Sequence, residues 1–169
     1  KTKMSSYKSV PTEFTIEEAL DTTEISDLRD EMQEWVDNMS GTGLENTNKY
    51  QMAEEAVSQL ENVDSINFDE IWDALPDDGL ISADELMAVK FTSNLYTPKS
   101  RKQHPSRAYR LSNAITHITD ALQEMRDYIE DKLGAKEMPE EVKSLMSAIG
   151  DIESQIQELD NVEFPGMFS

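Results

Sequence analysis

The stretch 111–129, LSNAITHITDALQEMRDYI, decides the fold class of this chain. Its apolar residues recur at spacings of four and three: Leu111, Ile115, Ile118, Leu122, Met125 and Ile129. A second series with similar spacing follows in the sequence: Val142, Leu145, Ile149, Ile152, Ile156 and Leu159. A spacing near 3.5 is typical of amphipathic helices that pack against each other. Gly134 and Pro139, between the two series, suit a helix end and a helix start. We therefore expect an antiparallel, coiled-coil-like helical hairpin over 107–169.

A second hairpin is predicted nearer the N-terminus. Residues 24–39 repeat the helical spacing, SGTG at 40–43 ends that helix, and another helix is expected over 47–63. Shorter helices are expected around 68–75 and from Ala83 towards Leu95. The predicted fold is all-α, with two antiparallel helical hairpins joined by short helices and a basic linker. Residues 23–37 align without gaps on 116–130, which fits either a duplication or the general likeness of acidic amphipathic helices.

The 169 residues carry a net charge of −20, and this charge is unevenly distributed. Residues 13–89 contain 22 acidic and two basic residues, whereas residues 90–110 contain six basic and none acidic. From this pattern we divide the chain into a basic N-terminal tail (1–12), an acidic helical region (13–96), a basic linker (97–106) and the long helical hairpin (107–169).

The composition narrows the classes of partner and of chemistry. A surface this acidic opposes direct binding of nucleic acid through the acidic half, and of an anionic membrane, and favours a protein with a basic surface. The chain has no cysteine, so disulfides and cysteine-based catalysis or zinc sites are excluded. The basic first residues are not followed by an apolar stretch of the signal-peptide kind, and no run of 18 apolar residues occurs. We expect a cytoplasmic protein.

The stretch around Gly79 resembles a calcium-binding EF-hand loop. With Gly79 at the sixth position of such a loop, Asp78, Ser82 and Glu85 fall at ligand positions, and Asp73 becomes the first ligand only with a one-residue insertion. The same letters also describe a turn at Pro76–Asp77–Asp78–Gly79 followed by a capping box of Ser82 and Glu85. We favour the turn and cap, and expect no metal.

No motif for catalysis or for a cofactor is recognisable. The two histidines, His104 and His117, have no partners at catalytic or zinc spacing, and Gly-rich phosphate loops are missing from the sequence. We expect a protein that is not an enzyme and has no cofactor. The basic segment, formed by Lys99, Arg101, Lys102, Arg107 and Arg110, either binds a partner or neutralises the chain's own acidic half.

The acidic helix 24–39 offers a candidate binding face made of Asp27, Asp30, Glu31, Glu34 and Asp37. Carboxylates three or four positions apart on a helix lie about 5–6 Å from one another. This spacing is close to the roughly 7 Å between neighbouring phosphates of a nucleic-acid strand. Such a face can therefore occupy a protein groove that is built for DNA or RNA.

The hairpin also resembles one that recurs in small acidic all-helical proteins of bacteriophages. The likeness rests on Leu28–Arg29–Asp30–Glu31, Trp35, Asp37–Asn38–Met39, Lys49–Tyr50 and Leu60–Glu61, with a weaker echo at Arg110–Leu111–Ser112–Asn113–Ala114. It covers mainly residues 24–63. Most members of this group have no assigned function, so the resemblance implies a phage origin and no catalytic residues.

Three functions are compatible with these features. The first is a phage-encoded binding protein that inhibits a host nucleic-acid-binding defence enzyme, of the anti-CRISPR or anti-restriction type, in the bacterial cytoplasm. The second is a helical assembly or adaptor protein of a phage that forms homo-oligomers through its helical hairpins. The third is a degenerate EF-hand-like calcium module.

Overall fold

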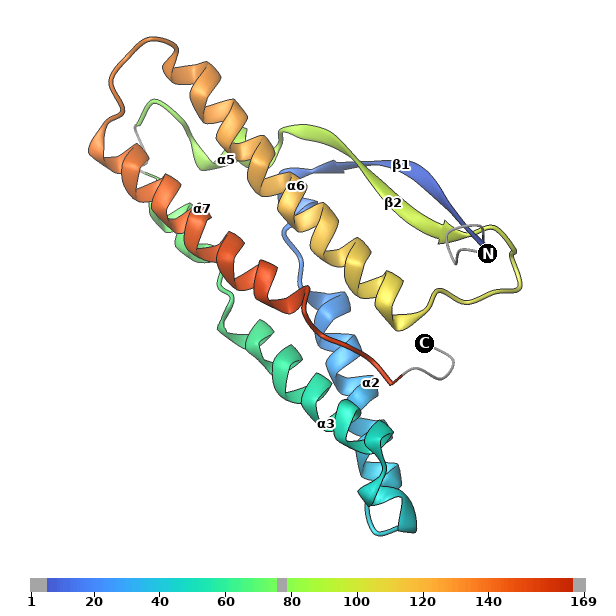
Figure 1. Cartoon of the computed structure of the whole chain (residues 1–169). Coiled ribbons are helices and arrows are strands. Elements are labelled where there is room, and N and C mark those ends of the chain that lie inside the picture. The colour runs from blue at the N-terminus through green and yellow to red at the C-terminus, as the bar shows by residue number, and fades with distance from the viewer. Residues whose placement is uncertain (1–5, 76–78, 166–169) are drawn as a thin grey trace.

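The computed structural model describes residues 6–75 and 79–165, and these form helices together with one small sheet (Figure 1). The elements follow in this order: β1 (Tyr7–Thr15), α1 (Ile16–Ala19), α2 (Thr23–Met39), η2 (Gly43–Asn46), α3 (Asn48–Leu60), η3 (Glu61–Ser65), α4 (Asp69–Asp73), α5 (Ala83–Met87), β2 (Lys90–Pro98), α6 (Arg107–Leu133) and α7 (Glu140–Leu159). The helices predicted around 24–39, 47–63 and 68–75 and the two long C-terminal helices are confirmed, with small differences at their ends.

The prediction of an all-α fold is wrong, because β1 and β2 pair as a two-stranded antiparallel sheet. The helix expected from Ala83 towards Leu95 ends at Met87, and the chain continues as a strand from Lys90. Phe91 and Ser93 are buried while Thr92 and Asn94 are exposed, which is the two-residue alternation of a strand. Aromatic, β-branched and other strand-forming residues in Tyr7–Thr15 and Lys90–Pro98 suit this conformation better than a helix or a tail.

Pro11 and Asn113 each lie at one edge of the two-stranded sheet. Two hydrogen bonds of 2.9 Å flank the sheet, one from Lys99 N to Ser6 O and one from Ile16 N to Val89 O. In an antiparallel pair every second residue bonds across to the other strand, so the even-numbered residues of β1 bond to β2. Pro11 is at an odd position, where an amide would point away from β2, and its missing N–H therefore does not interrupt the hydrogen bonds between the strands. On the other edge, Asn113 of α6 accepts from Tyr96 N (2.9 Å) and donates to Tyr96 O (2.7 Å).

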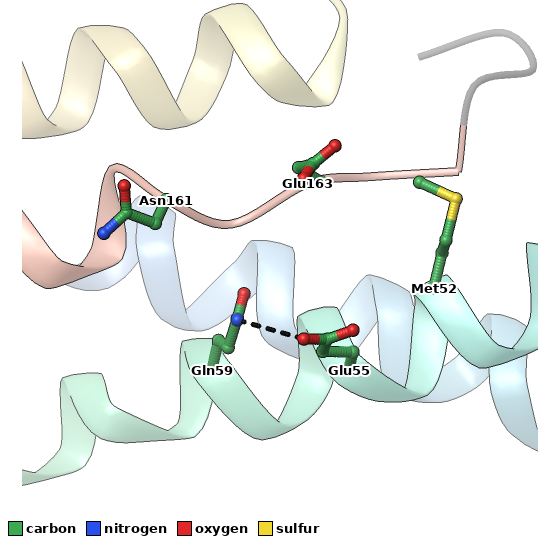
Figure 2. Close-up of a pocket in the computed structure, with 5 residues that line it drawn as sticks. All are labelled: Met52, Glu55, Gln59, Asn161 and Glu163. Carbon is green, nitrogen blue, oxygen red and sulfur yellow. Dashed lines mark hydrogen bonds between the residues drawn. The ribbon is translucent and has the colours of Figure 1, made fainter.

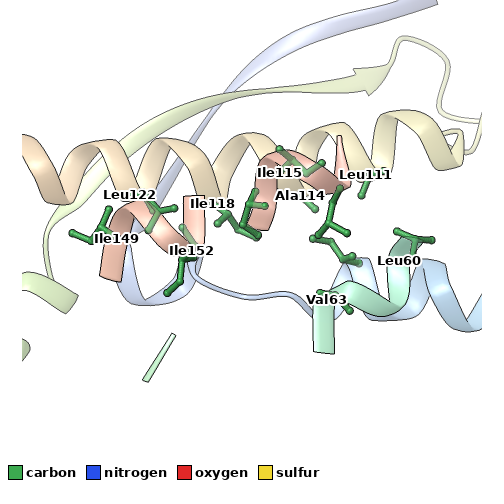
Figure 3. Packing of buried hydrophobic residues seen from close by; sticks show 14 of the residues in the cluster. Leu60, Val63, Leu111, Ala114, Ile115, Ile118, Leu122, Ile149 and Ile152 are labelled. Atoms are coloured by element: carbon green, nitrogen blue, oxygen red, sulfur yellow. The ribbon is translucent and has the colours of Figure 1, made fainter. Parts of the chain in front are cut away.

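Helix α6 lies at the centre of the apolar core. Figure 3 shows its side chains packed against α7, through Ile149 and Ile152, and against the end of the α2–α3 hairpin, through Leu60 and Val63. Buried apolar residues from the acidic region and from the long hairpin belong to one continuous cluster. The α2–α3 hairpin extends away from this core, and its tip lies far from the loop that joins α6 to α7 (Figure 1).

Replacing Asn113 tests how strongly α6 holds the sheet. In Asn113→Ala, both polar groups of Tyr96 lose their partner, and we expect the free energy of unfolding to fall by about 1–3 kcal/mol. The matched control is Asn94→Ala on the exposed side of the same strand. Urea unfolding of both variants gives the comparison, and equal stabilities would contradict this role of Asn113.

Candidate functional site

Helix α2 presents four exposed carboxylates along one side. Asp27, Asp30, Glu34 and Asp37 follow each other at spacings of three, four and three, so they share one face of the helix; we call them the acidic stripe. The ten-residue separation of the first and last corresponds to about 15 Å along the axis. Asp30 lies 3.2 Å from Arg29 Nε, and Asp37 accepts a hydrogen bond from Gln33 (2.9 Å).

The position of the acidic stripe follows from the apolar side of the same helix. Ile25, Leu28, Met32 and Val36 are buried in the core. At 100° per residue, the stripe falls on the side of the helix away from these four. The local sequence therefore forces the stripe to face outward, on a hairpin that already extends from the core (Figure 1).

Glu31, predicted as part of the same face, lies apart from the stripe. Its carboxylate is bound by Arg110 Nη2 (2.6 Å) and Nη1 (2.9 Å) and by Arg107 Nε (3.3 Å). Arg110 Nη2 also contacts Glu24 Oε1 at 2.7 Å. We call these four residues the α2–α6 ion-pair network. The hydrogen bond from Arg110 is the largest cause that lowers the pKa of Glu31.

The predicted basic segment is consequently divided in two. Arg107 and Arg110 belong to the network, where their side chains are more than two-thirds buried. Lys99, Arg101 and Lys102 lie exposed in the connection between β2 and α6. Within residues 6–75 and 79–165, the side chains of these three make no ion pair or hydrogen bond.

The residues considered as calcium ligands have other partners or lie apart. Ser82 Oγ accepts from Glu85 N (3.1 Å) and Glu85 Oε1 accepts from Ser82 N (3.0 Å), which confirms the predicted capping box. The other carboxylate oxygen of Glu85 accepts from the Tyr128 hydroxyl and from Lys132 Nζ (3.2 Å). These contacts, Tyr128 first, lower the pKa of Glu85 to about 2.

Of the two remaining ligand candidates in the proposed loop, only Asp73 lies among the described residues. Asp73 is exposed at the end of α4, whereas Asp78 and the rest of the turn at 76–78 lie outside the described residues. In the part of the chain that the structure describes, no group of three or more His, Cys, Asp or Glu side chains is placed to hold a metal ion.

A polar cluster between the sheet and α6 has no counterpart in the sequence analysis. Buried Ser93 donates to Asp120 (2.5 Å), and His117 Nδ1 lies 2.9 Å from the carbonyl oxygen of Ala19, so that nitrogen carries the proton. Phe14 packs against the imidazole at 5.0 Å between ring centroids. Burial lowers the pKa of His117, although the carbonyl of Ala19 and the charges of Asp21 and Asp120 oppose this shift. The other histidine, His104, is exposed in the loop before α6.

Two concave regions lie on or near the α2–α3 hairpin. The first, about 210 Å³, lies between α3 and the segment after α7 and is lined by Met52, Glu55, Gln59, Asn161 and Glu163 (Figure 2). The second, about 240 Å³, lies beside the acidic stripe and is lined by Glu31, Glu34, Trp35, Asn38 and Arg107. We call this second region the Trp35 groove. Trp35 is half-buried and packs against the core.

Comparison with known proteins gives no match: no protein-family model fits the chain, and no curated protein or solved structure is significantly similar to it. Among the described helices, none has both the length and the apolar character needed to cross a membrane. The interpretation of function therefore rests on the arrangement of charges and grooves.

The α2–α6 ion-pair network should contribute to stability. Arg110→Gln removes three charge-assisted contacts from partly buried carboxylates, and we expect a loss of about 1–2 kcal/mol in the free energy of unfolding. Arg101→Gln removes the same charge from an exposed position and is the matched control. Urea unfolding at low and high salt should show a difference between the variants that shrinks as salt rises. Equal destabilisation by both variants would instead indicate a general effect of net charge.

His117 should make stability depend on pH near neutrality. Because its pKa is lowered in the folded protein, the unfolded chain binds more protons, and stability falls as pH drops through the ordinary histidine pKa of about 6.5. We expect the loss between about pH 7.5 and about pH 5.5 to be smaller in His117→Gln than in the parent. Thermal unfolding at the two pH values measures it, with His104→Gln as control. An unchanged pH dependence in His117→Gln would contradict the assignment.

Proposed function

We propose that this chain is an acidic binding protein, and not an enzyme, whose acidic stripe occupies the basic groove of a nucleic-acid-binding protein. The observation that carries the proposal is the outward-facing series of four carboxylates on a helix that projects from the core. Successive carboxylates advance about 4.5–6 Å along the helix axis, and lysine and arginine side chains are long enough to bridge the difference from phosphate spacing.

The proposed target is a host defence enzyme of a bacterium, such as a CRISPR or restriction effector, and the proposed setting is the bacterial cytoplasm. The support for this setting is the resemblance of residues 24–63 to hairpins of acidic bacteriophage proteins. A protein that blocks such an enzyme needs no catalytic residues, because filling the groove is sufficient to exclude nucleic acid.

The Trp35 groove adds a feature that charge alone does not provide. It places an aromatic side chain and Asn38 directly beside Glu34 of the stripe. A cationic side chain of the partner that reaches Glu34 can also contact the tryptophan ring, and arginine is favoured at such sites because it stacks on aromatic faces. We include this groove in the proposed interface.

The proposal predicts binding that depends on the acidic stripe, on salt and on competing DNA. Immobilised protein should capture nucleic-acid-binding proteins from a bacterial lysate at low salt, and both raised salt and added duplex DNA should release them. The quadruple variant Asp27→Asn, Asp30→Asn, Glu34→Gln and Asp37→Asn should lose most of this capture. Mass spectrometry of the eluted proteins gives the measurement.

A matched control separates the stripe from overall charge. Glu130→Gln, Asp131→Asn, Glu137→Gln and Asp151→Asn remove four exposed carboxylates from α6, α7 and the loop between them, away from α2 in the sequence. This variant should capture the same proteins as the parent. Equal loss in both quadruple variants, or capture that duplex DNA does not reverse, would exclude mimicry by the stripe.

A further inference from the structure

The connection between β2 and α6 carries a compact positive surface on an otherwise negative molecule. Lys99, Arg101 and Lys102 lie within four consecutive positions and are all exposed; we call them the basic turn. The connection begins at the end of the sheet and leaves it on a different side from the tip of the α2–α3 hairpin (Figure 1).

The basic turn is held in place at both ends. Lys99 N donates to Ser6 O (2.9 Å), and Ser106 N donates to the hydroxyl of Tyr7 (3.0 Å). Between these anchors, Ser100 accepts from Lys102 N through its side chain and from Gln103 N through its carbonyl, each at 3.2 Å. A backbone that is already ordered loses little conformational entropy when its side chains bind a partner.

Among residues 6–75 and 79–165, no acidic side chain pairs with the basic turn. Glu24 and Glu31 of α2 are already paired with Arg110, and Glu31 also with Arg107. The acidic stripe lies on the outward side of α2, beyond these two residues. Two complementary charged surfaces therefore occur on one molecule in positions where they do not meet.

We propose that the basic turn binds the acidic stripe of a second copy of this chain, so that the protein associates head to tail. The stripe provides four carboxylates over about 15 Å, which is enough length for three cations carried on one short turn. Repulsion between two molecules of net charge −20 acts over longer distances and is screened beyond about 8 Å at physiological salt, whereas the contacting pairs are screened less.

Nucleic acid is the less favourable occupant of the basic turn. A duplex carries a phosphate charge about every 1.7 Å along its whole length. It would extend past the turn and bring that charge close to the acidic surfaces of the same molecule. A second copy brings its stripe on a projecting hairpin, with the rest of its charge further away (Figure 1).

The contact joins two different surfaces, and this determines how the assembly grows. In a pair, one copy keeps a free stripe and the other keeps a free turn, so association continues as an open chain or closes as a ring. This inference does not depend on the proposed function. It adds that a partner which takes the stripe competes with self-association.

Sedimentation velocity of the purified full chain tests the inference without any partner. At about 0.15 M salt, where the net repulsion is screened, the parent should sediment faster as its concentration rises, and this dependence should be lost at about 0.5 M salt, where the Debye length is only a few ångströms. A turn variant (Lys99→Gln, Arg101→Gln, Lys102→Gln) and a stripe variant (Asp27→Asn, Asp30→Asn, Glu34→Gln, Asp37→Asn) should each remain monomeric. Lys90→Gln, Lys136→Gln, Lys143→Gln removes three exposed cations elsewhere and should associate like the parent.

Mixing the two variants gives the decisive result. The turn variant keeps an intact stripe and the stripe variant keeps an intact turn, so an equimolar mixture should form a one-to-one complex and stop there. Matching circular dichroism and urea midpoints confirm that both variants are folded. A monomeric parent at all concentrations, or a mixture of folded variants that does not associate, overturns the inference, as does duplex DNA that binds the parent through the turn while the parent stays monomeric.

Discussion

The 27-residue helix α6 contacts three groups of neighbouring elements at the same time, and these contacts constrain where the other elements lie. Its apolar face is buried against α7 and the end of the α2–α3 hairpin (Figure 3). A second side carries Asn113, whose side-chain amide bonds both the N–H and the carbonyl of Tyr96 at the outer edge of β2, as a neighbouring strand would do. Its first turn carries Arg107 and Arg110, which bind α2. Because one rigid element carries all three contacts, the positions of the sheet, the hairpins and α2 depend on one another.

The same constraint decides which charges remain available at the surface. The first turn of α6 brings two cations against Glu24 and Glu31, so part of the acidic region is neutralised inside the molecule. Those ion pairs are partly buried and have additional hydrogen bonds, which makes them worth more than fully exposed pairs. The acidic stripe and the basic turn take no part in these ion pairs with Arg107 and Arg110. The molecule therefore carries separate negative and positive surfaces, because folding pairs the central charges and leaves the acidic stripe and the basic turn exposed.

Local periodicity accounts for what could be predicted from the sequence. The helices were recognisable because their apolar residues repeat over many turns, and the capping box of Ser82 and Glu85 involves residues three apart. The strand Lys90–Pro98 was missed because one of its inward positions is Ser93, whose partner Asp120 lies on another element. Glu31 was grouped with its acidic neighbours for the same reason, since its partner Arg110 is 79 positions away. Spacing along one helix shows which side chains share a face, but not which distant cation approaches it.

Charge of this kind governs how fast a partner is attracted more than which partner is retained. Complementary fields raise association rates and weaken with salt, while selectivity usually comes from a few well-packed groups. The acidic stripe alone would attract many basic surfaces, and in the proposed self-association it also attracts the basic turn of a second copy. The Trp35 groove lies immediately beside the stripe and combines an aromatic face with an amide and a carboxylate. A partner whose cation fits that groove contacts the tryptophan ring in addition to the carboxylates. The proposed contact of the basic turn with the stripe uses the carboxylates alone. Selection between a target and self-association is therefore expected to depend on Trp35 more than on the number of carboxylates.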